Sequence, residues 1–465
     1  MAVRVTLVAV VALLSIAAVP AGTTQATHPP IQVFLDAAGA DAALAEKALA
    51  TLGRSWRDGY TSMFIDMARL LTPRRVDDAV VPHPVRVRLL RFLERQTRQR
   101  FGDDLGAWRE WTWKRPYDPH PDYAAFKGAT YAVLDPKMAE FFRTPTATIR
   151  LDEVDWGGVA VNGIPPLDHP RVLAAAAATY LRDSHVIFGV VVNGQARAYP
   201  KRILAWHEMA LDRLGNEELT IVYCTLCGTV IPYKSVVGGV KRTFGTSGLL
   251  YRSNKLMFDH ETMSLWSTLE GRPVVGRLAG EPLTLEMFPV VTTTWAEWKA
   301  QHPATTVLSV ETGHDRDYSE GAAYREYFET DRLMFRVPKI DTRLPNKAEV
   351  LGVLVPAVGG GRQAVALSAA YLAKQRVHHQ IVEGRTFVVL TTRQGANRVF
   401  ETGPIRIDAW VNDQVVRDTT GRQWKVTEEA LVPMAEAVPP LRRVAAFRAF
   451  WFGWYAQFPD TILVK

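Results

Sequence analysis

The feature that most constrains the fold is an internal repeat in the last two thirds of the chain. The pattern Trp-x-x-Trp-x-x-x-His/Phe-Pro-x-Thr occurs at residues 295–305 and again at 451–461. A strand-like run at 220–223 has a similar counterpart at 386–389. Self-similarity of this kind indicates that one supersecondary unit is used twice. With only two copies, we expect a pseudo-symmetric pair and not a solenoid.

The predicted fold class is α+β, with a helical N-terminal region followed by two diverged β-rich α+β repeats. Apolar side chains recur at helical spacing through residues 31–140, which predicts helices there. Short β-branched runs separated by turn residues dominate 149–310 and 335–465, called the first copy and the second copy from here on. The 465 residues, 48% hydrophobic and 22% charged, are typical of a globular protein of several domains.

Three local patterns in the first copy predict particular elements. Residues 171–181 are predicted to form a helix. Asn193-Gly194 between two apolar runs predicts a β-hairpin with a type I′ turn. Residues 200–212 are predicted to form a second helix, on which His207 lies in an apolar stripe and therefore points inward.

Residues 1–22 are predicted to be a secretory signal peptide. Arg4 supplies a short positive start, residues 5–19 are mostly apolar, and small residues around Ala21 are suitable for cleavage. The apolar run is too short to span a bilayer comfortably, and a retained anchor is the alternative. The mature protein is therefore expected to be periplasmic or secreted, with membrane contact only through this segment.

Charge gives little indication of a partner. The net charge is +7, but the basic residues are spread along the chain and form no recognisable nucleic-acid motif. We therefore expect no nucleic-acid partner. The expected partner is a small molecule or an envelope component whose identity the sequence does not give.

The most reactive side chains lie in one short stretch, 223–229 (YCTLCGT), which holds both cysteines of the chain. Strand-like residues before and after it predict a strand, a turn and a strand. Glycine at the end of the turn is typical of metal knuckles, in which backbone amides point at the sulfur atoms. A metal site is therefore the first interpretation of this stretch.

The predicted ligands are Cys224, Cys227 and His207. Two sulfurs and one nitrogen are suitable for copper(I), or for zinc when a fourth ligand is present. Met257 would complete a copper site and Asp259 a zinc site. We therefore predict an extracytoplasmic protein with a copper or zinc ion as its cofactor, either a binding protein or a redox or metal-dependent enzyme of unknown substrate.

Other uses of the cysteines remain open. A thiol–disulfide oxidoreductase is disfavoured because β-branched residues follow the motif, where a helix would be needed to activate a thiol. Cys224 could be a nucleophile with His207 as its base. Outside the cytoplasm the two thiols would oxidise unless a metal or a reductant held them. A local disulfide in a non-catalytic envelope binding or structural module is therefore another alternative.

Two carboxylates near these residues have simpler interpretations. Glu208 faces another side of the predicted helix than His207, so we expect a surface or capping charge. Asp259 lies among turn-forming residues and is equally well explained as a hairpin cap.

The second copy provides an internal comparison for the cysteines. Aligning the strands places Thr391 opposite Cys224 and Gln394 opposite Cys227, while Gly395 lies opposite the glycine that ends the motif. The second copy therefore retains the pattern of the fold and lacks both thiols. This indicates that the scaffold does not require cysteines and that they are an addition in the first copy.

Several motifs together resemble a bacterial and archaeal family known as domain of unknown function 3179, over roughly residues 145–465. The matching elements are 198–200, 206–208, 223–229, 244–251, 256–262, 264–267 and the Trp-x-x-Trp motif with His302-Pro303. The chain departs from the family pattern at Thr225, where proline is usual, and at His260, where arginine is usual. The resemblance implies no activity.

Overall fold

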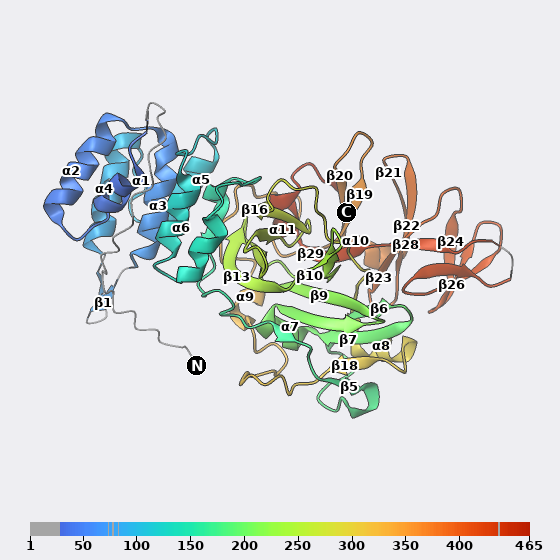
Figure 1. Ribbon diagram of the computed structural model, residues 1–465. Helices are drawn as coiled ribbons and strands as arrows, with labels where there is room; N and C mark the ends of the chain where they lie inside the picture. The colour runs from blue at the N-terminus through green and yellow to red at the C-terminus, as the bar shows by residue number, and fades with distance from the viewer. Residues whose placement is uncertain (1–27, 73, 77–78, 82, 436–437) are drawn as a thin grey trace.

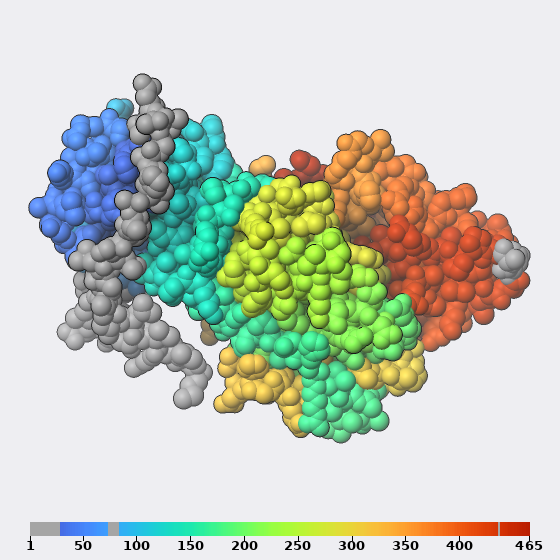
Figure 2. Space-filling view, in the orientation of Figure 1, coloured from blue at the N-terminus to red at the C-terminus, as the bar shows by residue number. Residues whose placement is uncertain are grey.

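The computed structural model describes residues 28–465, except 73, 77–78, 82 and 436–437. The predicted signal peptide, 1–22, lies outside the described residues. Figure 1 shows a helical region at one end, a β-rich middle and a second β-rich part at the other end. Figure 2 shows the same three parts following one another along the molecule. Among the described residues, no helix has the length and apolar character needed to cross a membrane.

The N-terminal region is helical, as predicted. Its core consists of large apolar side chains such as Phe34, Phe64 and Trp108, which are fully buried. Phe141 and Phe258 are in ring contact, so this core continues into the first copy without a gap. The elements are α1 (Ile31–Ala37), α2 (Ala42–Arg54), α3 (Thr61–Leu70), β1 (Arg74–Val76), β2 (Ala79–Val81), α4 (Pro84–Thr97), α5 (Leu105–Trp113) and α6 (Tyr123–Tyr131), with short 3-10 turns between and after them.

Each copy contains a sheet in which four strands follow the same order, and the first copy adds β5 at one edge. In the first copy the order is β17-β6-β7-β18-β5, and in the second it is β29-β19-β20-β30. In both sheets the central hairpin is antiparallel and the next strand, β18 or β30, is parallel to it. The bounds are β5 (Val172–Ala174), β6 (Val186–Val192), β7 (Gln195–Pro200), β17 (Val291–Thr294), β18 (Thr306–Leu308), β19 (Glu349–Pro356), β20 (Arg362–Ser368), β29 (Ala446–Phe450) and β30 (Ile462–Val464).

The remaining strands also correspond between the copies. β8 (Met209–Leu214), β9 (Glu217–Cys224) and β10 (Thr229–Lys234) match β21 (Val377–Val382), β22 (Arg385–Thr391) and β23 (Asn397–Glu401) in order and direction. The meander β13 (Phe244–Tyr251), β14 (Asn254–Asp259), β15 (Leu265–Ser267) and β16 (Arg272–Val275) matches β24 (Ile407–Asn412), β25 (Val415–Asp418), β26 (Gln423–Val426) and β27 (Ala430–Pro433). Smaller strands are β3 (Val154–Trp156), β4 (Leu167–Asp168), β11 (Val236–Val237), β12 (Val240–Lys241) and β28 (Leu441–Val444).

Equivalent side chains make equivalent contacts in the two copies. The indole of Trp298 in α8 (Trp295–Gln301) donates to Thr305, and that of Trp454 in α11 (Trp451–Gln457) donates to Thr461, both at 2.9 Å. Likewise, the indole of Trp266 donates to Asp259 and the indole of Trp424 donates to Asp418. The doubled α+β fold is therefore present in side-chain detail as well as in strand order.

The copies pack against each other in a reciprocal way. Strand β10 of the first copy lies beside β29 of the second, and β23 of the second lies beside β17 of the first. Ala396, in the turn before β23, is fully buried against Trp295 and Trp298 of the first copy. Each copy therefore places one of its turns against the helix of the other. Residues 311–334, called the connecting segment here, join the copies and include α9 (Arg325–Phe328).

Two local predictions need correction, and one is confirmed. The predicted helix at 171–181 is wrong, because Val172–Ala174 pairs with β18 as an edge strand and a short 3-10 turn follows. The predicted helix at 200–212 ends at His207, because the next residue is left-handed and strand β8 begins at once. The Asn193-Gly194 hairpin is confirmed, with φ of 49° and 75° at its two residues.

Candidate functional site

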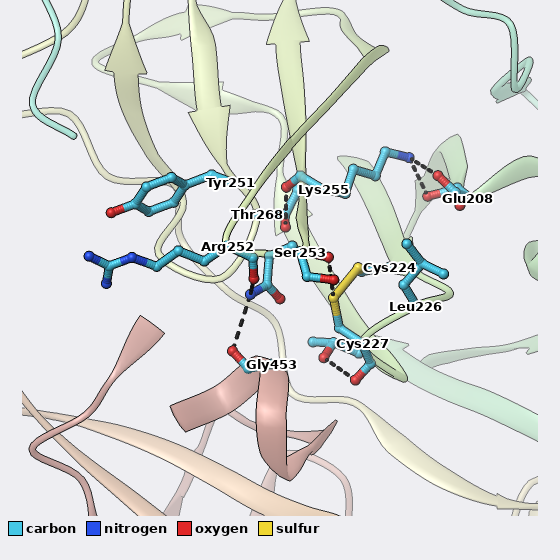
Figure 3. Close-up of a disulfide and its surroundings, with 12 residues drawn as sticks. Glu208, Cys224, Leu226, Cys227, Tyr251, Arg252, Ser253, Lys255, Thr268 and Gly453 are labelled. Carbon is cyan, nitrogen blue, oxygen red and sulfur yellow. Dashed lines mark hydrogen bonds and ion pairs between the residues drawn. A yellow bond between two sulfur atoms is a disulfide. The ribbon is translucent and has the colours of Figure 1, made fainter. Parts of the chain in front are cut away.

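The C-x-x-C motif lies in the turn between β9 and β10, in the strand–turn–strand arrangement predicted from the sequence. Cys224 ends β9 and pairs with Thr229 at the start of β10. The amide of Cys227 donates to the carbonyl of Cys224 at 3.1 Å, which tightens the turn. Gly228 has a φ of 61°, a conformation that favours glycine. This turn brings the two sulfurs together, and they form a disulfide (Figure 3).

The disulfide is buried. Cys224 is 3% exposed and Cys227 is fully buried. Its apolar cover comes from the first copy, the second copy and the connecting segment: Leu226, Leu250, Tyr327, Val337, Phe450, Phe452 and Ala456. Because three distant parts of the chain supply this cover, a reagent can reach the sulfurs only after at least one of them moves.

Hydrogen bonds attach the same turn to its cover. The amide of Phe450 donates to the carbonyl of Cys227 at 2.7 Å. The hydroxyl of Tyr327 donates to the carbonyl of Leu226 at 2.8 Å. The turn is therefore bonded both to the second copy and to the connecting segment.

Helix α11 of the second copy approaches the disulfide closely. A Cβ atom on Gly453 would lie 3.3 Å from Cβ of Cys227. The side-chain amide of Asn254 donates to the carbonyl of Gly453 at 3.1 Å, and the Cys227 sulfur lies 3.4 Å from the carbonyl oxygen of Ser253 (Figure 3). The β13–β14 turn and α11 thus enclose the sulfurs from two sides.

His207 points inward, as predicted, but its ring nitrogens are bonded elsewhere. The ring is fully buried at the end of α7 (Lys201–His207). Nδ1 lies 2.9 Å from the carbonyl oxygen of Pro165, and Nε2 is hydrogen-bonded to the hydroxyl of Tyr318. Burial lowers the pKa of His207 to about 4, so the ring is neutral at pH 7. Nδ1–H therefore donates to Pro165, and Nε2 accepts from Tyr318.

The two candidate fourth ligands also have other surroundings. Met257 is fully buried in the main apolar core, opposite Thr246 and Trp266 in its sheet. The carboxylate of Asp259 accepts from the amide of Thr262 at 2.7 Å and from the indole of Trp266 at 2.8 Å. Asp259 thus caps the turn after β14, which is the simpler of the two interpretations drawn from the sequence.

The predicted ligands are not brought together as a metal centre. In the part of the chain that the structure describes, no group of three or more His, Cys, Asp or Glu side chains is arranged to hold a metal ion. The two sulfurs are bonded to each other, and both nitrogens of His207 have protein partners. The residues therefore do not fit a copper or zinc centre in this oxidised form. Metal binding by the reduced thiols stays a prediction.

Glu208 differs from its predicted role as a surface or capping charge. It is 8% exposed, and its carboxylate lies 3.2 Å from the ammonium group of Lys255, which is 4% exposed (Figure 3). The hydroxyl of Tyr324 lies 3.5 Å from the same carboxylate. The left-handed conformation of Glu208, at φ 56°, turns its side chain away from the helix and toward β14.

Burial also shifts the pKa values of the two residues that lie beside the Glu208 carboxylate. It lowers the pKa of Lys255, and the neighbouring Glu208 opposes that effect. Burial and the Glu208 carboxylate both raise the pKa of Tyr324. Lys255, Tyr318 and Tyr324 were not among the residues predicted from the sequence. Only Lys255 had a local indication, because it is a charged residue that opens the apolar run of β14.

Comparison with known proteins gives a family and nothing closer. No curated protein matches the chain, and no solved structure matches it. A family model described as "Protein of unknown function (DUF3179)" matches residues 161–461, well over half of the chain. This span includes the C-x-x-C turn and all strands of the second copy except the last, β30. The chain therefore belongs to the DUF3179 family, as the motifs of its sequence indicated.

Proposed function

We propose that this protein is a non-catalytic binding module that works outside the cytoplasm, and that its C-x-x-C motif is a structural cross-link. The observation that carries the proposal is the burial of the disulfide beneath the second copy and the connecting segment. Disulfides persist in oxidising compartments, which supports the predicted periplasmic or secreted location.

The geometry does not favour a redox role for the disulfide. Thiol–disulfide exchange requires a thiolate to reach one sulfur, and here the two cysteines are 3% and 0% exposed. The motif joins two strands, so neither cysteine opens a helix, as the first cysteine of a thioredoxin-like motif does. His207 is bonded to Tyr318 and Pro165, so it is not placed as a base for Cys224.

The second copy shows what the cross-link replaces. Its corresponding turn, 392–396, is one residue longer than 225–228 and contains Gln394 and Gly395. This turn is closed by a hydrogen bond from the amide of Ala396 to the hydroxyl of Thr392 at 3.0 Å. One copy therefore closes its turn with a covalent bond and the other with hydrogen bonds. The contact of turn 225–228 with the second copy is called the first joint, and the contact of turn 392–396 with the first copy is called the second joint.

Free-thiol titration tests this proposal against the metal alternative. Native protein is treated with buffer, with a strong chelator, or with denaturant, each with and without a reductant. A cross-link predicts that thiols appear only in the samples with reductant. Two thiols released by chelator alone, together with copper or zinc in elemental analysis, would overturn the proposal and support a metal centre built on Cys224 and Cys227.

A further inference from the structure

We infer that a polar pocket at the second joint between the copies binds the oxyanion group of a small molecule, a phosphate or a carboxylate. This inference names the ligand class and so rests on the proposal that the protein is a binding module. The pocket lies between the end of α8 in the first copy and the strands β23 and β26 of the second copy. Its volume is about 230 Å³, which is enough for a small anion and a few waters.

Arg398 is the key group in the pocket wall. Its side chain is 2% exposed, and its Nε donates a hydrogen bond to Oε1 of Glu428 at 2.8 Å. Nη2 bonds the same oxygen and also the side-chain oxygen of Gln301 at 2.7 Å. Nη1 has no hydrogen-bond partner among the described residues. A buried guanidinium N–H without a partner is costly, so the site is completed by an acceptor from outside.

A second buried arginine leaves more donors unpaired. Arg443 is 3% exposed at its side chain and lies 3.8 Å from Oε2 of Glu428. In the described chain its Nε and Nη1 are also without partners. One carboxylate, Glu428, therefore faces two guanidinium groups and cannot neutralise both. The two guanidinium groups and one carboxylate leave one excess positive charge, which favours binding of an anion.

The ring of His302 adds a further polar atom to the pocket. Its Nε2 is buried and lies 3.7 Å from Glu428, which is beyond hydrogen-bond length. Lys425 lines the same pocket from the exposed face of β26, and Asp413 lines it as well. The pocket lining thus holds two cations, Arg398 and Lys425, and two carboxylates, Glu428 and Asp413. Arg443 does not line the pocket but lies near Glu428 as a third cation.

The equivalent place at the first joint lacks these groups. Phe458 follows α11 in the same position in which His302 follows α8. The ring of Phe458 packs on Trp454 with centroids 4.7 Å apart, and the ring of His302 packs on Trp298 with centroids 4.1 Å apart. Val230 in β10 corresponds to Arg398 in β23, because each is the second residue of its strand to pair across the hairpin. The repeated unit therefore accommodates apolar residues at these two positions, which indicates that the charges at the second joint are an addition to the fold.

Isothermal titration calorimetry of the full-length protein tests this inference. Inorganic phosphate and succinate are titrated separately, which distinguishes a phosphoryl from a carboxylate ligand. We expect saturable binding of at least one anion at a single site. His302→Phe, which installs the side chain of the other joint, should weaken that binding on the order of tenfold, the effect of losing about one hydrogen bond. The double variant Arg398→Val/Glu428→Leu should abolish it.

The controls separate loss of the site from loss of the fold. Lys374→Gln removes one exposed positive charge on α10 (Ala369–Lys374), away from the pocket, and should bind as the unchanged protein does. Melting temperatures show whether each variant is folded. No heat with either anion, or equal binding by the double variant, would overturn the inference. The thiol titration would be unaffected by that result, so the two proposals fail separately.

Discussion

His207 illustrates how burial determines the chemistry open to a single side chain. An inward imidazole close in sequence to two thiols suggests a ligand or a base. In the structure its two nitrogens are bonded to Pro165 and Tyr318, and its pKa is lowered to about 4 by burial. The ring is thus a neutral connector between the first copy and the connecting segment.

The low pKa of His207 predicts a pH dependence of stability. The unfolded chain binds the proton near pH 6.5, whereas the folded chain binds it near pH 4. The contribution of His207 to the free energy of unfolding is therefore complete above pH 6.5. It is lost as the pH falls toward 4, by about 3 kcal/mol in total. Urea unfolding between pH 4 and 7.5 measures this loss. His207→Gln should flatten the slope, while His169→Gln, at an exposed site, should leave it unchanged. An equal slope in both variants would contradict this assignment.

The Lys255–Glu208 pair predicts strong coupling between two buried charges. Lys255→Met leaves the Glu208 carboxylate buried without its cation, which should lower the free energy of unfolding by about 3–5 kcal/mol. The double variant Lys255→Met/Glu208→Gln should recover part of this loss, because no unpaired charge remains. Urea unfolding of the four proteins in this double-mutant cycle gives the coupling energy. Additive effects would show that the two groups do not interact.

At the scale of elements, the same contacts recur in both copies and can be tested as matched pairs. A Cβ on Gly189 of β6 would lie 2.2 Å from the indole of Trp298, and one on Gly352 of β19 would lie 2.0 Å from the indole of Trp454. Each glycine lets a helix lie flat on its sheet.

Gly189→Ala and Gly352→Ala should therefore each lower the free energy of unfolding by about 1–3 kcal/mol, the cost of overpacking a rigid core. Gly53→Ala is the control, because it lies in helix α2 beside the flexible end of Gln96, and alanine favours a helix. Chemical denaturation compares the three variants. A loss of stability in only one of these two variants would contradict the equivalence of the two copies.

The disulfide turn is a second element whose contribution can be estimated. A bond between Cys224 and Cys227 closes a loop of four residues, which corresponds to about 2 kcal/mol from chain entropy. Cys224→Ala/Cys227→Ala should lower the free energy of unfolding by this amount, and reduced wild-type protein should show a similar loss. Denaturation with and without reductant measures both values. An unchanged stability would remove the structural role proposed for the bond.

At the scale of the whole molecule, sequence patterns predicted what is local and repeated. The α+β class, the N-terminal helices, the doubled unit, the Asn193-Gly194 hairpin and the strand–turn–strand around the cysteines all depend on periodicity and turn residues. The helix predicted at 171–181 failed because pairing with β18, more than 130 residues away, overrides its local preference.

The partners of the candidate site could not be predicted, because they come from distant segments. Tyr318, which bonds His207, is 111 residues further along the chain. Phe450, which bonds the C-x-x-C turn, lies in the second copy. A segment between two repeats carries no periodic pattern, so its role as a cover becomes visible only in three dimensions.

The cover over the disulfide can be examined by following its reduction in native protein at increasing urea concentrations below the unfolding transition. If the bond is a buried cross-link, a small thiol should reduce it on the order of a hundredfold more slowly than in the unfolded chain, and the rate should rise with urea as the cover opens. A rate in native buffer equal to that of the unfolded chain, and independent of urea, would show that the sulfurs are accessible and would favour a redox function.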